Sequence, residues 1–100
     1  MWFSSTPVPS HVPSPDQPRK LVLYKYDVCP YCQRVLQKLP QWKVDLELAD
    51  TMKDPKARMT LEEKTGTTQV PCLFIDDVPL FESLEIVAWL DAYAKAGHAT

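Results

Sequence analysis

The sequence has few of the features that mark nucleic-acid or membrane binding. No run of Lys and Arg is long enough to neutralise a track of phosphates, and 11 basic against 13 acidic residues give a net charge of −2, so we expect no nucleic-acid partner. No stretch approaches the roughly 20 apolar residues of a membrane span, so we expect no membrane partner. The N-terminus lacks the basic and apolar regions of a secretory signal, which predicts a cytoplasmic protein.

Cysteine is also scarce, since the chain has only Cys29, Cys32 and Cys72. A small and odd number argues against a secreted disulfide scaffold, and a Cys-x-x-Cys pair points instead to catalysis or metal binding in a reducing compartment. The length of 100 residues and the hydrophobic fraction of 45% are typical of one small globular domain.

Proline is abundant at one end of the chain. Pro7, Pro9, Pro13, Pro15 and Pro18 lie among Ser and Thr. This composition removes backbone donors and offers little apolar surface to bury. We therefore predict a proline-rich disordered or polyproline-like tail over residues 1–19 and a folded domain over residues 20–97.

The first half of the domain is predicted to form a strand, a helix and a second strand. Residues 21–26 are nearly all apolar or β-favouring, which suits a central strand buried on both faces. Pro30 suits the first turn of a helix whose apolar face recurs at helical spacing, and Pro40 is expected to end that helix. Residues 44–48 alternate apolar and acidic side chains, as in a strand with one solvated face.

The second half is predicted to add a helix, a hairpin and a final helix. Asp54 suits the N-cap and Gly66 the C-terminal cap of a partly exposed helix. Residues 70–75 and 78–81 are expected to form strands joined by a tight turn, with Pro79 placing the last strand at the sheet edge. A helix opening at 82–83 and ending at Gly97 completes the order β-α-β-α-β-β-α.

The motif Cys29-Pro30-Tyr31-Cys32 lies at the predicted start of the first helix. The thiolate is the reactive form of cysteine, and a helix N-terminus favours it. The apolar stripe includes Cys32 and excludes Cys29, so we expect an exposed nucleophile at Cys29 and an inward resolving thiol at Cys32.

Cys72 is either a buried apolar residue or a third reactive thiol, and we favour burial because free cysteine is among the most buried residue types.

Together with Val70-Pro71 after Gly66 and the predicted order of elements, this motif resembles the glutaredoxins over residues 20–96. The resemblance implies an α/β thioredoxin-like fold, with a four-stranded mixed sheet in the order 2-1-3-4, helices on both faces and a cis bond before Pro71. It also implies a glutathione-dependent thiol–disulfide oxidoreductase that reduces glutathione mixed disulfides and protein disulfides.

The same resemblance implies how glutathione, the reducing co-substrate, is held. The N-terminus of the last helix at Ser83 would meet the γ-glutamyl carboxylate and Glu82 its ammonium group, while Val70 would pair with the peptide backbone. Ser83 as a simple helix cap, and Tyr31 as an exposed filler, are the alternatives. The full set implied for substrate binding is Lys25, Tyr31, Gln69, Val70, Pro71, Glu82 and Ser83.

The chain departs from the family pattern in its cations. The lysine usual three residues before the first cysteine is displaced to Lys25, and Gln69 and Phe81 are closer to transferase-like glutaredoxins. No arginine follows Gly66, so the cation for the glycyl carboxylate would be Lys25, Arg58 or Lys64, or would be absent.

Two other functions compete with this one. Some glutaredoxins hold a glutathione-ligated iron–sulfur cluster between two subunits, but by resemblance Pro30 disfavours it, and a brown chromophore on anaerobic purification would reverse the ranking. A glutathione transferase-like binding domain is weaker, because these 100 residues contain no all-helical second domain. We expect no metal, a monomer, and as partners glutathione and glutathionylated or disulfide-containing proteins.

Overall fold

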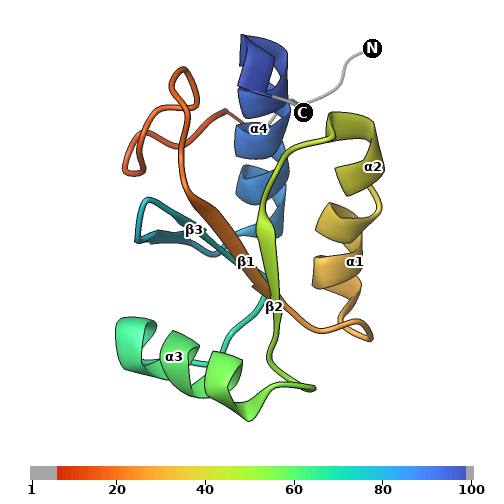
Figure 1. The fold of residues 1–100 in the computed structure, drawn as a ribbon, viewed down its shortest axis with the longest axis vertical. Coiled ribbons are helices and arrows are strands. Elements are labelled where there is room, and N and C mark those ends of the chain that lie inside the picture. The colour runs from red at the N-terminus through yellow and green to blue at the C-terminus, as the bar shows by residue number, and fades with distance from the viewer. Residues whose placement is uncertain (1–6, 99–100) are drawn as a thin grey trace.

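The computed structural model of the protein describes residues 7–98 and has the predicted order of strands and helices, with one further short helix before the second strand (Figure 1). Within these residues no helix is long and apolar enough to cross a membrane. The elements are β1 (Leu21–Lys25), α1 (Pro30–Leu36), α2 (Leu39–Trp42), β2 (Glu47–Asp50), α3 (Pro55–Thr65), β3 (Cys72–Ile75), β4 (Val78–Leu80), α4 (Ser83–Tyr93) and a wider last turn, η1 (Ala94–His98).

The four strands form one mixed sheet in the order β2-β1-β3-β4, which confirms the predicted fold. β1 runs parallel to β2, and β3 runs antiparallel to both β1 and β4. Leu23 pairs with Leu73 at the centre, and Pro79 lies on the edge strand β4 as predicted. Proline is tolerated there because only one side of an edge strand needs backbone donors.

Alternation along the strands divides the apolar side chains between the two faces of the sheet. Leu21 and Leu23 of β1 join the larger core with α1 and α4, where Trp89 is fully buried. On the opposite face Tyr24 and Phe74 pack with α3. The helices therefore cover both faces, and α3 covers only one end of its face (Figure 1).

The first helix differs from its prediction at the C-terminal end. α1 ends at Leu36, and Pro40 lies in the first turn of a separate short helix, α2. The prediction that Pro40 ends the helix was wrong in position, because proline is well tolerated where a backbone N–H would be unpaired anyway. α2 ends at Lys43 in a left-handed conformation with φ 53°.

The second strand also begins later than predicted. Its pairing with β1 starts where Glu47 lies opposite Val22 and ends where Asp50 lies opposite Lys25. Alternation over 44–48 identified a strand, but its bounds depend on where the partner strand begins and ends.

The predicted turns and caps of the second half are present. Asp54 caps α3 by accepting a hydrogen bond from the Lys56 N–H at 3.0 Å, and Gly66 closes it with φ 79°. Asp76 and Asp77, both at positive φ, form the hairpin turn between β3 and β4. α4 ends at Tyr93 and continues as η1, in which the backbone leaves the helical conformation at Gly97, the predicted end, with φ 94°.

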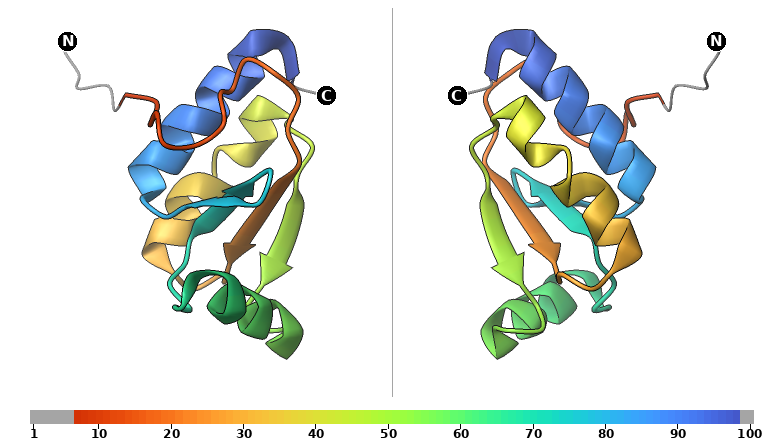
Figure 2. Two further views of the ribbon diagram at one scale, coloured as in Figure 1. Left: turned by 90° about the vertical axis from the view of Figure 1, so that its left-hand side faces the viewer. Right: turned by 90° about the vertical axis from the view of Figure 1, so that its right-hand side faces the viewer.

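The proline-rich segment before β1 lies along α4 (Figure 2). The first six residues of the predicted tail are outside the described residues. Residues 7–19 form neither helix nor strand, but Val12 is buried in the main core and the Pro13 carbonyl accepts a hydrogen bond from Trp89 Nε1 at 2.9 Å. The Arg19 N–H donates to the Tyr93 hydroxyl at 2.9 Å. Val12, Pro13 and Arg19 therefore anchor the segment on the domain, while most of its other side chains stay exposed.

Candidate active site

Cys29 is the N-cap of α1, at the end of the short loop that connects β1 to this helix. Its sulfur accepts a hydrogen bond from the Cys32 N–H at 3.4 Å and lies 4.0 Å from the Val70 carbonyl oxygen. Only 5% of the residue is exposed, so the expectation of an exposed thiol was wrong. The loop before β3 covers the sulfur, and helical periodicity within α1 carries no information about that loop.

The other two thiols are fully buried. Cys32 faces the interior as predicted, and burial raises its pKa to about 12. Cys72 lies on β3, where burial likewise raises its pKa to about 12, in agreement with the preference for a core residue. Both groups are therefore protonated thiols at neutral pH.

A cleft of about 270 Å³ lies beside the dithiol. It collects six of the seven residues implied for substrate binding. The Val70–Pro71 bond is cis, as expected. The cleft is lined by Tyr31, Arg34, Gln69, Val70, Pro71, Phe81, Glu82, Ser83 and Leu84.

The Val70 N–H has no hydrogen-bond partner among the described residues, and the Val70 carbonyl is contacted by a thiol alone. This thiol is that of Cys29, whose sulfur lies 4.0 Å from the carbonyl oxygen. A backbone N–H and C=O left open beside a cleft can bind an extended peptide as an added strand does. The geometry therefore suits a ligand with amide groups.

The start of α4 forms another part of the cleft. Glu82 is the N-cap and its side chain makes no capping hydrogen bond, so the first N–H groups of the helix have no side-chain partner from that residue. Ser83 is buried and its hydroxyl accepts a hydrogen bond from Arg34 at 3.0 Å. A helix N-terminus and a guanidinium attract a carboxylate, and the exposed Glu82 carboxylate attracts an ammonium group.

Sequence reasoning did not identify Arg34 as a binding residue. It lies one helical turn after Tyr31, whose ring is 5.7 Å from the guanidinium carbon and is 59% exposed. The spacing of three residues was the available signal, since it places both side chains on one face of α1. Tyr31 and Arg34 together form one wall of the cleft.

Lys25 is not brought to the cleft. Its ammonium group lies 2.7 Å from Asp27 and 3.2 Å from Asp50, and its side chain is only 12% exposed. The hydrogen bond to Asp27 raises the pKa of Lys25. The implied contact of Lys25 with glutathione stays a prediction, and in this structure two carboxylates neutralise the cation away from the cleft.

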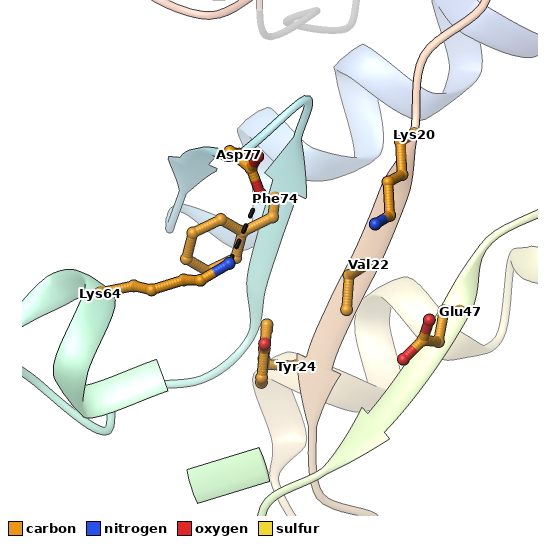
Figure 3. A pocket seen from close by; sticks show the side chains of 7 residues that line it. All are labelled: Lys20, Val22, Tyr24, Glu47, Lys64, Phe74 and Asp77. Atoms are coloured by element: carbon orange, nitrogen blue, oxygen red, sulfur yellow. Dashed lines mark hydrogen bonds and ion pairs between the residues drawn. The ribbon is translucent and has the colours of Figure 1, made fainter. Parts of the chain in front are cut away.

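The other two candidate cations also lie outside the cleft. Arg58 is exposed on α3. Lys64 reaches from α3 across a separate hollow of about 190 Å³ on the open sheet face, where it pairs with Asp77 at 3.4 Å and lies 5.3 Å from the centre of the Phe74 ring (Figure 3). Among the residues lining the cleft, Arg34 is the cation.

Metal-ligating side chains do not gather at the dithiol. Over residues 7–98, no three His, Cys, Asp or Glu side chains are arranged to hold a metal ion. The site places the Cys29 thiol beside a cleft with both polar and apolar lining.

Solved structures of two kinds share this fold. The buckwheat glutaredoxin–glutathione complex is 18% identical with a TM-score of 0.61, covering 82% of this chain and 83% of that one. The holo form of glutaredoxin C1 from Populus tremula x tremuloides is 22% identical with a TM-score of 0.58, covering 77% and 85%. An epsilon-class glutathione S-transferase from the housefly, Musca domestica, is 28% identical with a TM-score of 0.62 over 76% of this chain.

The transferase match is limited in extent, since this chain covers only 36% of the housefly protein. A search of curated proteins found no significant match. The Glutaredoxin family model matches residues 21–80, which contain β1 to β4, the dithiol and the cis-proline loop. The chain therefore belongs to the glutaredoxin family, a family of thioredoxin-like thiol oxidoreductases.

Proposed function

We propose that the protein is a glutathione-dependent thiol–disulfide oxidoreductase in which Cys29 is the nucleophile and Cys32 the resolving thiol. The observation that supports this most directly is the position of Cys29, whose sulfur lies 4.0 Å from the Val70 carbonyl at the border of the cleft. A cytoplasmic location, where glutathione keeps thiols reduced, is part of the proposal.

The proposed reaction exchanges one disulfide for another. The Cys29 thiolate attacks the glutathionyl sulfur of a mixed disulfide, a bond forms between these two sulfurs, and the partner leaves as a thiolate that takes a proton from solvent. A second glutathione thiolate then attacks the Cys29 mixed disulfide, releasing oxidised glutathione and restoring the Cys29 thiolate. For protein disulfides, Cys32 closes a bond to Cys29 instead.

In this proposal the cleft binds the tripeptide by its ends and its backbone. The α4 N-terminus, Ser83 and Arg34 receive the γ-glutamyl carboxylate, and Glu82 receives the ammonium group. Val70 pairs with the peptide amide groups of glutathione. The buckwheat glutaredoxin that shares this fold was solved as a complex with glutathione, which is consistent with such a site.

The test is glutathione-dependent reduction of the hydroxyethyl mixed disulfide, coupled to glutathione reductase and NADPH. Wild type and Cys32→Ser should both turn over, because the one-thiol reaction needs only Cys29, and Cys29→Ser should be inactive. Cys72→Ala is the control for a thiol outside the site and should remain active. Equal loss in the Cys29 and Cys32 variants would contradict the assigned roles, and an inactive wild type would contradict the function.

A further inference from the structure

A second cleft, lined mainly by apolar surface, lies beside the residue that precedes the nucleophile. It has a volume of about 240 Å³ and nearly all of its surface is apolar. Its walls come from the loops that follow β1 and β2, whereas the glutathione cleft is built around β3, β4 and α4. Cys29 adjoins both clefts, because its sulfur lies 4.0 Å from the carbonyl of Val70 in the glutathione cleft and Val28 of the apolar cleft directly precedes it in the chain. The apolar cleft is lined by Tyr26, Asp27, Val28, Asp50, Met52 and Lys53.

Two large apolar side chains in this cleft are exposed to solvent. Val28 is 81% exposed and precedes Cys29 directly, and Met52 is 69% exposed. Exposed apolar groups that gather at one place commonly mark an interaction site. Methionine suits such a surface because its thioether adapts to partners of different shape.

Hydrogen bonds hold both side chains in these exposed positions. The Asp50 carboxylate accepts from the N–H groups of Met52 and Lys53, each at 2.9 Å. On the other loop, the Asp27 carbonyl accepts from Gln33 Nε2 at 2.6 Å. The turns around Val28 and Met52 are thus fixed by side chains of the domain itself.

The charges around the cleft neutralise one another. Lys25 pairs with Asp27 and Asp50, and Lys53 pairs with Asp27 at 3.3 Å. Two cations and two anions leave no net charge to select a charged partner. This surface would therefore bind a partner through apolar contacts.

We propose that this cleft binds the leaving half of the substrate, and that the leaving half is a polypeptide whose cysteine is flanked by apolar residues. This rests on the proposed function, because a mixed disulfide has two halves and the cleft at the start of α4 receives the glutathionyl half. The Cys29 thiolate bonds to the glutathionyl sulfur, and the peptide sulfur leaves with the electron pair and takes a proton from solvent. An apolar side chain next to that sulfur fits between Val28 and Met52.

The test compares two synthetic peptides with one glutathionylated cysteine each, flanked on both sides by leucine in one and by serine in the other. Wild type should favour the leucine peptide roughly tenfold in kcat/KM, since partial burial of one such side chain corresponds to a factor of that order. Met52→Ser and Val28→Ser should each reduce the preference to about twofold. Met59→Ser is the matched control, because Met59 is 60% exposed on α3 outside the cleft, and it should keep the full preference.

The kcat/KM for each peptide is divided by the kcat/KM of the same variant for the hydroxyethyl mixed disulfide. The leaving half of this small substrate has no side chain to reach the cleft. If wild type reduces this small substrate but does not distinguish the peptides, or if Met52→Ser and Val28→Ser keep the preference, the inference is wrong and the proposed function stands. If wild type reduces no glutathionylated substrate, the proposed function fails and the inference fails with it.

Discussion

The carbonyl oxygen of Val70 lies 4.0 Å from the sulfur of Cys29, although 41 positions separate the two residues in the chain. Cys29 lies in the loop after β1 and Val70 in the loop before β3, and β1 and β3 are hydrogen-bonded neighbours in the sheet. The sheet therefore sets the distance between the nucleophile and the backbone proposed to hold its substrate.

Selective alkylation should distinguish the three thiols. At about pH 7 the native, reduced protein should take up one equivalent of iodoacetamide, at Cys29, because Cys32 and Cys72 are fully buried and their pKa values are raised to about 12. Peptide mapping by mass spectrometry locates the label. Rapid labelling of Cys72 before Cys29 would contradict this order, and Cys29→Ser serves as the control that should not be labelled rapidly.

The buried thiol of Cys72 predicts a loss of stability in alkali. Burial raises its pKa from 9.0 to about 12, so between these values the unfolded chain has released a proton that the native protein keeps. The free energy of unfolding therefore falls as pH rises from about 9 to about 12, and this contribution is fully present below about pH 9. Denaturant unfolding at several pH values measures it.

Cys72→Ala provides the comparison for this prediction. The variant should be less stable near neutral pH because it leaves a cavity, yet its stability should decline less steeply in alkali. Equal slopes in the two proteins would show that Cys72 does not cause the decline.

Arg34→Ala should weaken glutathione binding more than it slows the chemical step. The guanidinium binds the Ser83 hydroxyl at 3.0 Å in the cleft, and a hydrogen bond to a charged group contributes about 1.5–3 kcal/mol. We expect KM for glutathione to rise about tenfold with little change in kcat, measured in the coupled assay. Arg58→Ala, which removes an exposed arginine of α3 outside the cleft, should leave KM unchanged. Similar rises in both variants would point to net charge rather than to the cleft.

Val12→Ala should destabilise the whole domain even though Val12 precedes the first strand. Val12 is 8% exposed in the core cluster that includes Trp89, and truncating a buried aliphatic side chain costs about 1–3 kcal/mol. Val8→Ala is the control, because Val8 is 39% exposed and a change there should stay within about 0.5 kcal/mol. Denaturant unfolding followed by tryptophan fluorescence measures both, and equal stabilities of Val12→Ala and wild type would show that the segment does not contribute.

Local patterns predicted the elements of the fold well where the signal lies within the element. Helix caps and tight turns depend on the backbone conformation of a few adjacent residues, so a short stretch of sequence is enough to predict them. Examples are the caps Asp54 and Gly66 and the turn at Asp76-Asp77. The bounds of β2 were not predictable in this way, because they follow from pairing with β1.

The candidate site was predicted less evenly. Six implied residues share the cleft, whereas Lys25 is occupied by two carboxylates that approach from Asp27 and Asp50. Arg34 was missed because charged residues on a helix are usually solvated, and its hydrogen bond to Ser83 depends on how α4 packs beside α1.

The sequence by itself determined the order of elements, the dithiol at the head of α1 and the inward direction of Cys32, because periodicity and capping act over a few residues. Only the tertiary structure decided that Cys29 is covered by the Val70 loop, that the segment before β1 lies along α4, and that a mixed cleft and an apolar cleft both adjoin the nucleophile. These features depend on segments far apart in the chain, and their meeting is set by the packing of the whole sheet.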